Sequence, residues 1–181
     1  MYLISVEGGD GSGKGEAVRL LSEIAATFPF AKIHVTHEPR RHSELGKIAL
    51  AAVKKESLSP LREAGLFAAD RVDHSHTWIK PKLLRGELVI SDRNVHSSLV
   101  YQGIVGGLGV ECVAQMNSAA MRPDLVIWID CDPKKAMNRI ETGTLRISGS
   151  GKQEYFETIE LQTKIRKGFN NLFTGEITVP H

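Results

Sequence analysis

The stretch that decides the fold is Glu7-Gly-Gly-Asp-Gly-Ser-Gly-Lys-Gly-Glu16. It follows the apolar run at residues 3–6, leads into a helical pattern, and matches G-x-x-x-x-G-K. Between a strand and a helix, such glycines turn successive backbone N–H groups toward a phosphate, and the lysine reaches the terminal phosphates. The alternative is a glycine-rich turn with a chance lysine. We expect a phosphate-binding loop, and its residues are Gly8, Gly9, Asp10, Gly11, Ser12, Gly13 and the catalytic Lys14.

The loop departs from the common motif directly after its lysine. Gly15 stands where a serine or threonine hydroxyl usually holds Mg²⁺, and Glu16 follows it. Glu16 has three readings: it ligates Mg²⁺ in place of the hydroxyl, it repels the phosphates by like charge, or it lies on the solvent face of its helix. We therefore assign Gly15 and Glu16 to the nucleotide-binding loop and consider Glu16 a candidate metal ligand.

Composition and charge narrow the class of protein. The chain has 181 residues, 41% hydrophobic and 24% charged, which suits one domain with one substantial core. The formal net charge of +2 is too small to indicate nucleic acid binding. Cys112 and Cys131 show neither metal-ligand spacing nor a disulfide framework, no charged leader precedes the first strand, and no apolar stretch approaches the roughly 20 residues of a membrane span. We expect a cytoplasmic protein that binds neither nucleic acid nor membrane.

Short runs rich in β-branched residues alternate with helical patterns along the whole chain. The expected strands are residues 2–6, 32–36, 88–91, 125–129 and, more weakly, 177–179. The longest helical signal covers residues 153–173, and its last turns should pack on the core. This alternation is typical of an α/β fold, with a five-stranded parallel sheet between two layers of helices.

Polar and charged residues follow the expected strands. They are segments 36–41, 92–94 and 130–133, of which the first two are basic. In an open parallel sheet, ligands bind beyond the carboxyl ends of the strands. Two basic clusters facing a phosphate loop indicate that two phosphorylated ligands meet there. Phosphoryl transfer suits this arrangement, because it requires chiefly alignment and charge neutralisation from the protein.

At these positions the chain resembles the thymidylate kinase family over most of its length. Beside the phosphate loop, the resemblance is carried by Glu38-Pro39, Ser43-Glu-Leu-Gly-Lys47, Leu66-Phe-Ala-Ala-Asp-Arg71, Gly86-Glu-Leu-Val-Ile-Ser-Asp-Arg93, Ser97-Ser-Leu-Val-Tyr-Gln-Gly103 and Pro123-Asp-Leu-Val-Ile-Trp-Ile-Asp-Cys-Asp-Pro133. The Phe-Ala-Ala-Asp-Arg segment at 67–71 and the Ser-Ser-x-x-Tyr-Gln-Gly segment at 97–103 are far more specific than the phosphate loop. The resemblance implies a P-loop fold of the nucleoside-monophosphate-kinase type that transfers phosphate from ATP, with Mg²⁺, to dTMP.

The resemblance also implies an acceptor site for dTMP. Phe67 stacks on the thymine ring, unless it is a core residue of its amphipathic helix. Arg71, one turn later on the same face, hydrogen-bonds the base. Arg93, with one of Arg40 or Arg41, holds the acceptor phosphate through its planar guanidinium and is catalytic. The other implied acceptor residues are Asp10, Glu38, Ser97, Tyr101 and Gln102.

The implied donor site includes Arg139 and a lid at about residues 140–153. Gly11 stands where one class of the family carries an arginine, so a lid arginine has to supply that charge. Arg146 is the first candidate for this catalytic residue and Lys152 the second. The alternative is that this segment is a basic Gly/Ser-rich loop without a catalytic role. Asp92 is expected to organise Mg²⁺ through water, although an aspartate after a strand is also a common helix N-cap.

Several departures from the family pattern leave three readings open. His37 stands where many members have arginine and Asn94 where tyrosine is frequent, and family members usually continue past the position of His181 with a helix that helps to hold adenine, so ATP binding is expected to be weaker. The readings are a thymidylate kinase, a related nucleoside or nucleotide kinase with another base preference, and a nucleotide-binding module without turnover. The resemblance implies a homodimer, and the apolar segment 103–121 suits either its interface or an internal core helix.

Overall fold

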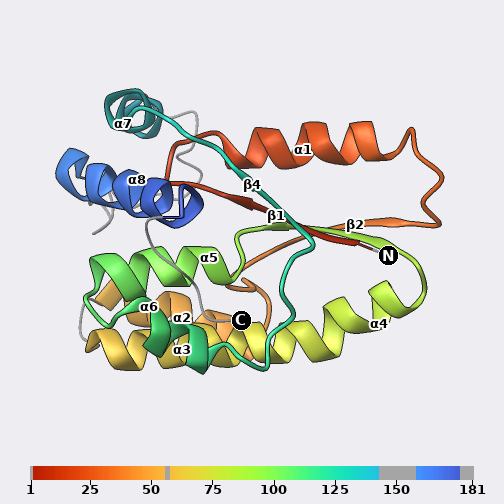
Figure 1. The fold of residues 1–181 in the computed structure, drawn as a ribbon, viewed down its shortest axis with the longest axis horizontal. Coiled ribbons are helices and arrows are strands. Elements are labelled where there is room, and N and C mark those ends of the chain that lie inside the picture. The colour runs from red at the N-terminus through yellow and green to blue at the C-terminus, as the bar shows by residue number, and fades with distance from the viewer. Residues whose placement is uncertain (1, 56–57, 143–157, 176–181) are drawn as a thin grey trace.

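A parallel sheet organises the molecule, of which the computed structural model describes residues 2–55, 58–142 and 158–175 (Figure 1). Its strands are β1 (Tyr2–Glu7), β2 (Ile33–His37), β3 (Leu88–Asp92) and β4 (Leu125–Trp128), in the order β2-β3-β1-β4. All three strand pairs are parallel. The expected α/β fold is confirmed, with four strands in the described part of the chain. The fifth expected strand, 177–179, lies outside the described residues.

Helices cover both faces of this sheet. On one face lies α1 (Lys14–Ala25), and on the other lie α3 (Pro60–His74), the π-helical turn η1 (Ser75–Ile79) and α4 (Lys80–Leu84) (Figure 1). Strand β3 shows why two layers are needed. Successive side chains of a strand point to opposite faces, so Leu88 and Ile90 pack in the cluster under α1 while Val89 packs with Ile79 of η1.

A second core lies beside the sheet. It joins α5 (Val95–Ser98), the π-helical segment η2 (Leu99–Val105), α6 (Val110–Met116) and α8 (Ile159–Phe173). Ile165 and Phe169 of α8 are fully buried there, so the expectation that the last turns of this helix pack on the core is confirmed. Val110 and Val113 are buried in the same cluster, which gives that part of segment 103–121 an internal role. The expected helical residues 153–157 lie outside the described residues.

Local chemistry explains where several helices begin. The Ser59 hydroxyl accepts from the backbone of the first turn of α3, with Pro60 at the first helical position. Helix α7 (Pro133–Glu141) starts in the same way after Asp132, and Thr158 caps α8. Side-chain oxygens at these positions satisfy N–H groups that have no partner within the helix.

The remaining elements complete the surroundings of the site. Helix α2 (Glu44–Lys55) packs on α3, and α7 and α8 lie near the end of the sheet where β1 and β4 finish (Figure 1). Among the described residues, no helix combines the length and the apolarity that crossing a bilayer requires.

Candidate active site

The loop between β1 and α1 has the conformation that its glycines allow. Gly8, Gly11 and Gly13 have φ of 148°, 71° and 102°, a region that favours glycine. A Cβ on Gly8 would lie 2.8 Å from the Ile129 carbonyl oxygen, and one on Gly11 would lie 2.4 Å from that of Ala136. The backbone of the loop is therefore closely packed against Ile129, which precedes α7, and against Ala136 within α7.

Lys14 points back into this loop from the first turn of α1. Its side chain is buried, and Nζ donates to the Gly9 carbonyl oxygen at 2.7 Å. Burial, followed by the nearby charge of Arg93, lowers the pKa of Lys14 to about 8. The loop thus holds an ammonium group that an incoming phosphate can engage.

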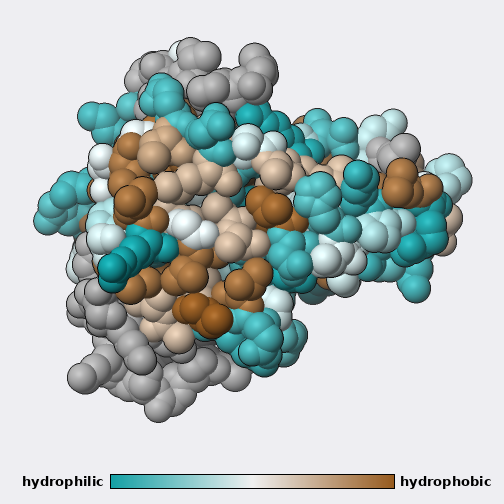
Figure 2. All heavy atoms as spheres, turned by 90° about the horizontal axis from the view of Figure 1, so that it is seen from below, coloured by the Kyte–Doolittle hydropathy of each residue, from teal (hydrophilic) through white to brown (hydrophobic). Residues whose placement is uncertain are grey.

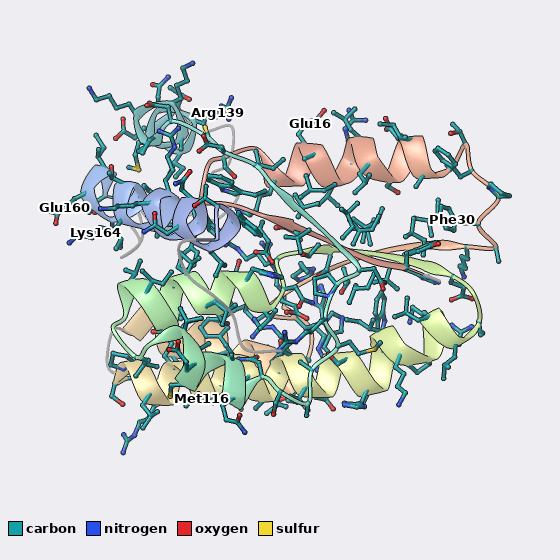
Figure 3. The ribbon with its side chains drawn as sticks, viewed as in Figure 1. Glu16, Phe30, Met116, Arg139, Glu160 and Lys164 are labelled. Carbon is teal, nitrogen blue, oxygen red and sulfur yellow. The ribbon has the colours of Figure 1, made fainter. Side chains whose placement is uncertain are left out.

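The two residues after the lysine differ in what surrounds them. A Cβ built on Gly15 would meet no described atom within 4 Å, so the position has room for a side chain. Glu16 is exposed on the outer side of α1 (Figure 3) and pairs with Arg19 at 2.6 Å, which lowers the pKa of Glu16. This geometry favours the solvent-face reading of Glu16, and its role as a metal ligand stays a prediction.

Arg93 joins the phosphate loop to the turn that follows β3. One guanidinium nitrogen donates to the Gly8 carbonyl oxygen and to the Ser97 hydroxyl, each at 3.1 Å. The other forms an ion pair with Asp10 and donates to the Tyr101 hydroxyl at 3.3 Å. The guanidinium also lies over the Tyr101 ring, 5.0 Å from its centroid. Five predicted site residues are thus brought into one cluster.

The charges in this cluster stabilise one another. Burial acts to raise the pKa of Asp10, yet Arg93 and Lys14 hold it below its usual value. Burial likewise acts against the charge of Arg93, but Tyr101, Asp10 and Asp92 raise its pKa. The cluster therefore keeps a fixed positive group beside the phosphate loop.

Asp92 ends β3 next to the phosphate loop, paired in register with Val6 of β1. Its Oδ1 atom is buried and has no hydrogen-bond partner among the described residues. The N-cap of α5 is Asn94, so Asp92 does not have the capping role considered above. The described residues contain no group of three ligands that would hold a metal on its own. A carboxylate with one unpartnered oxygen fits Mg²⁺, which proteins hold through one or two carboxylates, water and substrate phosphates.

Glu38 and Arg71 meet in a buried network. Arg71 donates to the Glu38 carboxylate and to the Asn117 amide oxygen, each at 2.6 Å. The His74 ring lies 3.1 Å from the same carboxylate and 3.0 Å from the Thr36 hydroxyl. This network fixes Arg71 against the carboxyl end of β2, and its contact with the base stays a prediction.

Phe67 and Gln102 lie on facing elements of the acceptor side. Phe67 is half-buried on α3, one turn before Arg71. The Gln102 amide donates to Glu63 of α3 at 2.7 Å, which braces η2 against that helix. The predicted contacts of both residues with substrate stay predictions.

Arg40 and Arg41 have different surroundings. The Arg40 backbone and side chain both bond Asp70, and the guanidinium also pairs with Asp73. Arg41 is exposed, and its backbone N–H donates to the His37 ring at 3.2 Å. Because Arg40 is committed to α3, the geometry favours Arg41 as the second arginine for an acceptor phosphate.

Arg139 extends from α7 toward the phosphate loop (Figure 3). It donates to the carbonyl oxygens of Gly11 at 3.3 Å and Ser12 at 3.2 Å. This places a guanidinium against the phosphate loop, and the role of Arg139 in binding ATP stays a prediction. Arg146 and Lys152 lie outside the described residues, and their roles stay predictions.

Three residues of the site network had no predicted role. Glu7 accepts from the Asn94 backbone N–H and from the Ser97 hydroxyl, Asp70 holds Arg40, and Asn117 holds Arg71. Glu7 and Asp70 lie inside the recognisable motifs, so their position was a usable signal. Asn117 carries no such signal, because only the fold brings α6 to α3.

Comparison with known proteins agrees with this geometry. The family model described as thymidylate kinase matches residues 6–179. A probable thymidylate kinase of Pyrococcus horikoshii is 39% identical, covering 94% of this chain and 82% of the relative. One of Pyrobaculum calidifontis is 37% identical, with 91% and 78% covered. The thymidylate kinase of Lactobacillus delbrueckii subsp. bulgaricus is 36% identical, with 94% and 82% covered.

Proposed function

This chain belongs to the thymidylate kinase family and is a phosphotransferase that phosphorylates dTMP with ATP, and from that premise we propose which residues hold each nucleotide. The observation that carries the assignment is the position of Arg93. Its guanidinium contacts both the Gly8 carbonyl of the phosphate loop and Asp10. A phosphate held by Arg93 therefore lies beside a phosphate held by the loop, which direct transfer between two nucleotides requires.

On the donor side, the backbone from Gly8 to Gly13 and the Lys14 ammonium hold the phosphates of ATP. Arg139 lines the same loop from α7, and the lid residue Arg146 adds a further positive charge. Bound Mg²⁺ would neutralise charge on the transferring phosphate, and Asp92 would hold it through water. The buried, unpartnered oxygen of Asp92 supports this role.

On the acceptor side, Arg93 and Arg41 hold the phosphate of dTMP. Phe67 stacks on thymine, and Arg71, already fixed by Glu38, bonds the base. The remaining acceptor residues line the sugar and the base, and they are Asp10, Ser97, Tyr101 and Gln102.

Calorimetry with dTMP and thymidine tests this assignment. Two arginines at the acceptor phosphate predict that dTMP binds at least about tenfold tighter than thymidine, since charge-assisted hydrogen bonds are among the strongest. Equal affinity for the two ligands would contradict the assignment and favour a nucleoside kinase. Binding of dTMP without turnover would favour the binding module.

We also propose a homodimer that forms through the outer face of α3. This face and α6 line a shallow hollow of about 620 Å³, whose apolar residues are Gly65, Ala68, Ala69, Val72 and Met116. Figure 2, which views the molecule from the side of α2, α3 and α6, shows apolar side chains gathered there. Light scattering should give a dimer for the wild type and a monomer for Val72→Asp. A monomeric wild type would refute the proposal.

The remaining assignments concern organisation and compartment. We propose that residues 1–181 form a single domain with a lid near 140–153. We also propose a cytoplasmic location, which suits Cys112 and Cys131 because neither forms a disulfide in the described structure.

A further inference from the structure

Glu7, the last residue of β1, is a fully buried carboxylate at the junction of the two nucleotide sites. One oxygen accepts from the Asn94 backbone N–H at 2.7 Å, and the other accepts from the Ser97 hydroxyl at 2.6 Å. Asn94 caps α5 and Ser97 lies within this short helix, which directly follows Arg93. The carboxylate therefore anchors the segment from which the acceptor arginine extends.

The hydroxyl of Ser97 links Glu7 to the Arg93 side chain. A hydroxyl has one proton to donate and two lone pairs that accept. Ser97 gives its proton to Glu7, so its lone pairs face outward, and Arg93 donates to it at 3.1 Å. When it is ionised, the Glu7 carboxylate thus determines which way the Ser97 hydroxyl faces the guanidinium.

The backbone of Arg93 needs the same support. Its φ is 72°, a left-handed conformation that residues other than glycine seldom adopt. The Arg93 N–H donates to the Val6 carbonyl at 3.0 Å, and the next N–H, of Asn94, donates to Glu7. Two hydrogen bonds to the end of β1, one from the Arg93 N–H and one from the Asn94 N–H, therefore hold this strained backbone in place.

Fold stability alone gives no reason for a charge at this place. Burial raises the pKa of Glu7 to about 7, although Ser97, Arg93 and the Asn94 amide oppose that rise. Arg71 of α3 also faces the carboxylate and acts in the same direction as Arg93. An uncharged residue of the same shape would avoid the cost of burying the charge.

We propose that Glu7 is a positioning residue, which orients Arg93 through the Ser97 hydroxyl and the Asn94 amide so that the acceptor phosphate site is formed before dTMP binds. This rests on the assignment of Arg93 to the phosphate of dTMP. Glu7 itself touches no reacting atom.

The variant Glu7→Gln tests the proposal without changing the shape of the side chain. Its carbonyl oxygen still accepts from the Asn94 N–H, but its NH₂ group faces Ser97 with protons, so the hydroxyl has to turn. The Kd of dTMP, measured by calorimetry, should rise about tenfold or more, as expected for a lost hydrogen bond involving charge. The Kd of ATP and the thermal midpoint should stay close to the wild-type values.

Glu87→Gln is the matched control, because it removes a carboxylate from the opposite end of the same sheet. Glu87 pairs with His34 and Arg85, and its side chain is 12% exposed. This variant should leave the Kd of dTMP unchanged. A rise equal to that of Glu7→Gln would overturn the proposal, since it would reflect a general loss of structure.

A double-mutant cycle separates positioning from a purely structural effect. If Glu7 acts through Ser97, the dTMP Kd of the double variant Glu7→Gln/Ser97→Ala should exceed that of Ser97→Ala alone by less than about twofold. Additive effects, an unchanged dTMP Kd in Glu7→Gln, or an equal weakening of ATP would each overturn the inference. The variant Arg93→Ala, measured alongside, distinguishes failure of the Glu7 proposal from failure of the assignment of Arg93 to the acceptor phosphate. If Arg93→Ala weakens dTMP and Glu7→Gln does not, only the role of Glu7 fails, whereas no effect of Arg93→Ala overturns the acceptor assignment as well.

Discussion

Replacing Arg93 by alanine should nearly abolish turnover with dTMP while ATP binding persists. The guanidinium is the group that reaches the phosphate loop from the turn after β3, through Gly8 and Asp10. Alanine removes every contact that this side chain offers to the acceptor phosphate. The backbone amides of the loop and Lys14, to which we assign the binding of ATP, remain.

The size of the effect follows from the number of bonds lost. A guanidinium holds a phosphate with two charge-assisted hydrogen bonds, each about 1.5–3 kcal/mol. Their loss amounts to about 3–6 kcal/mol, which corresponds to a fall in kcat/KM of roughly 10²- to 10⁴-fold. Fold stability should change far less. Asp10, the ionic partner of Arg93, is 37% exposed, so water replaces much of the lost interaction and the cost is about 0–1 kcal/mol.

The assay is coupled ADP formation with varied dTMP, accompanied by calorimetry of ATP binding. Arg85→Ala is the control, because Arg85 also pairs with a carboxylate, Glu87, but at the far end of the sheet. Arg93→Lys should lie between wild type and alanine, since it keeps the charge and loses the planar fork. An equal loss of ATP binding, or a fall in kcat/KM below tenfold, would refute the assignment of Arg93.

Three further predictions concern residues near the loop and the sheet. Glu16→Ala should leave the Mg²⁺ dependence of turnover unchanged, because Glu16 is exposed and paired with Arg19; a sharply higher Mg²⁺ requirement would make Glu16 a ligand. Gly15→Thr has room for its side chain, so it should fold normally, and activity should rise only if this position faces the metal; thermal melting and a Mg²⁺ titration measure both. Arg85 and then His34 lower the pKa of Glu87 to about 2, below its usual 4.5. The charged form of Glu87 therefore stabilises the fold above about pH 4.5 and loses this effect as the pH falls toward 2, so the deficit in thermal midpoint of Glu87→Gln at pH 6 should shrink on acidification; a constant deficit would contradict the linkage.

The local sequence predicted the strands of the sheet and the phosphate loop well. The four described strands lie within a residue or so of the expected ranges, because buried runs of β-branched residues between turn signals carry that information. The phosphate loop was predictable because its glycines and Lys14 form a contiguous motif. Neither π-helical segment was predicted, since an irregular turn inside a helix leaves the apolar spacing almost intact.

The site was predictable where residues lie within motifs and unpredictable where distant elements meet. Arg93 and Asp10 were identified separately, but their ion pair spans 83 positions of sequence and depends on the pairing of β1 with β3. Arg40 shows the reverse case. The sequence offered two adjacent arginines as equivalent, and only the packing of α2's entry on α3 brings Arg40 to Asp70. Long-range pairs of this kind depend on tertiary structure and leave no periodic trace.

The most direct test of the central claim is a coupled assay of ADP formation with ATP, Mg²⁺ and saturating dTMP, run beside dUMP, dCMP, AMP and thymidine. We predict turnover that is selective for dTMP, with Gly15 and Glu16 as a tolerated variation of the loop. Absence of ADP formation, with dTMP still bound in calorimetry, would contradict the kinase assignment of this chain.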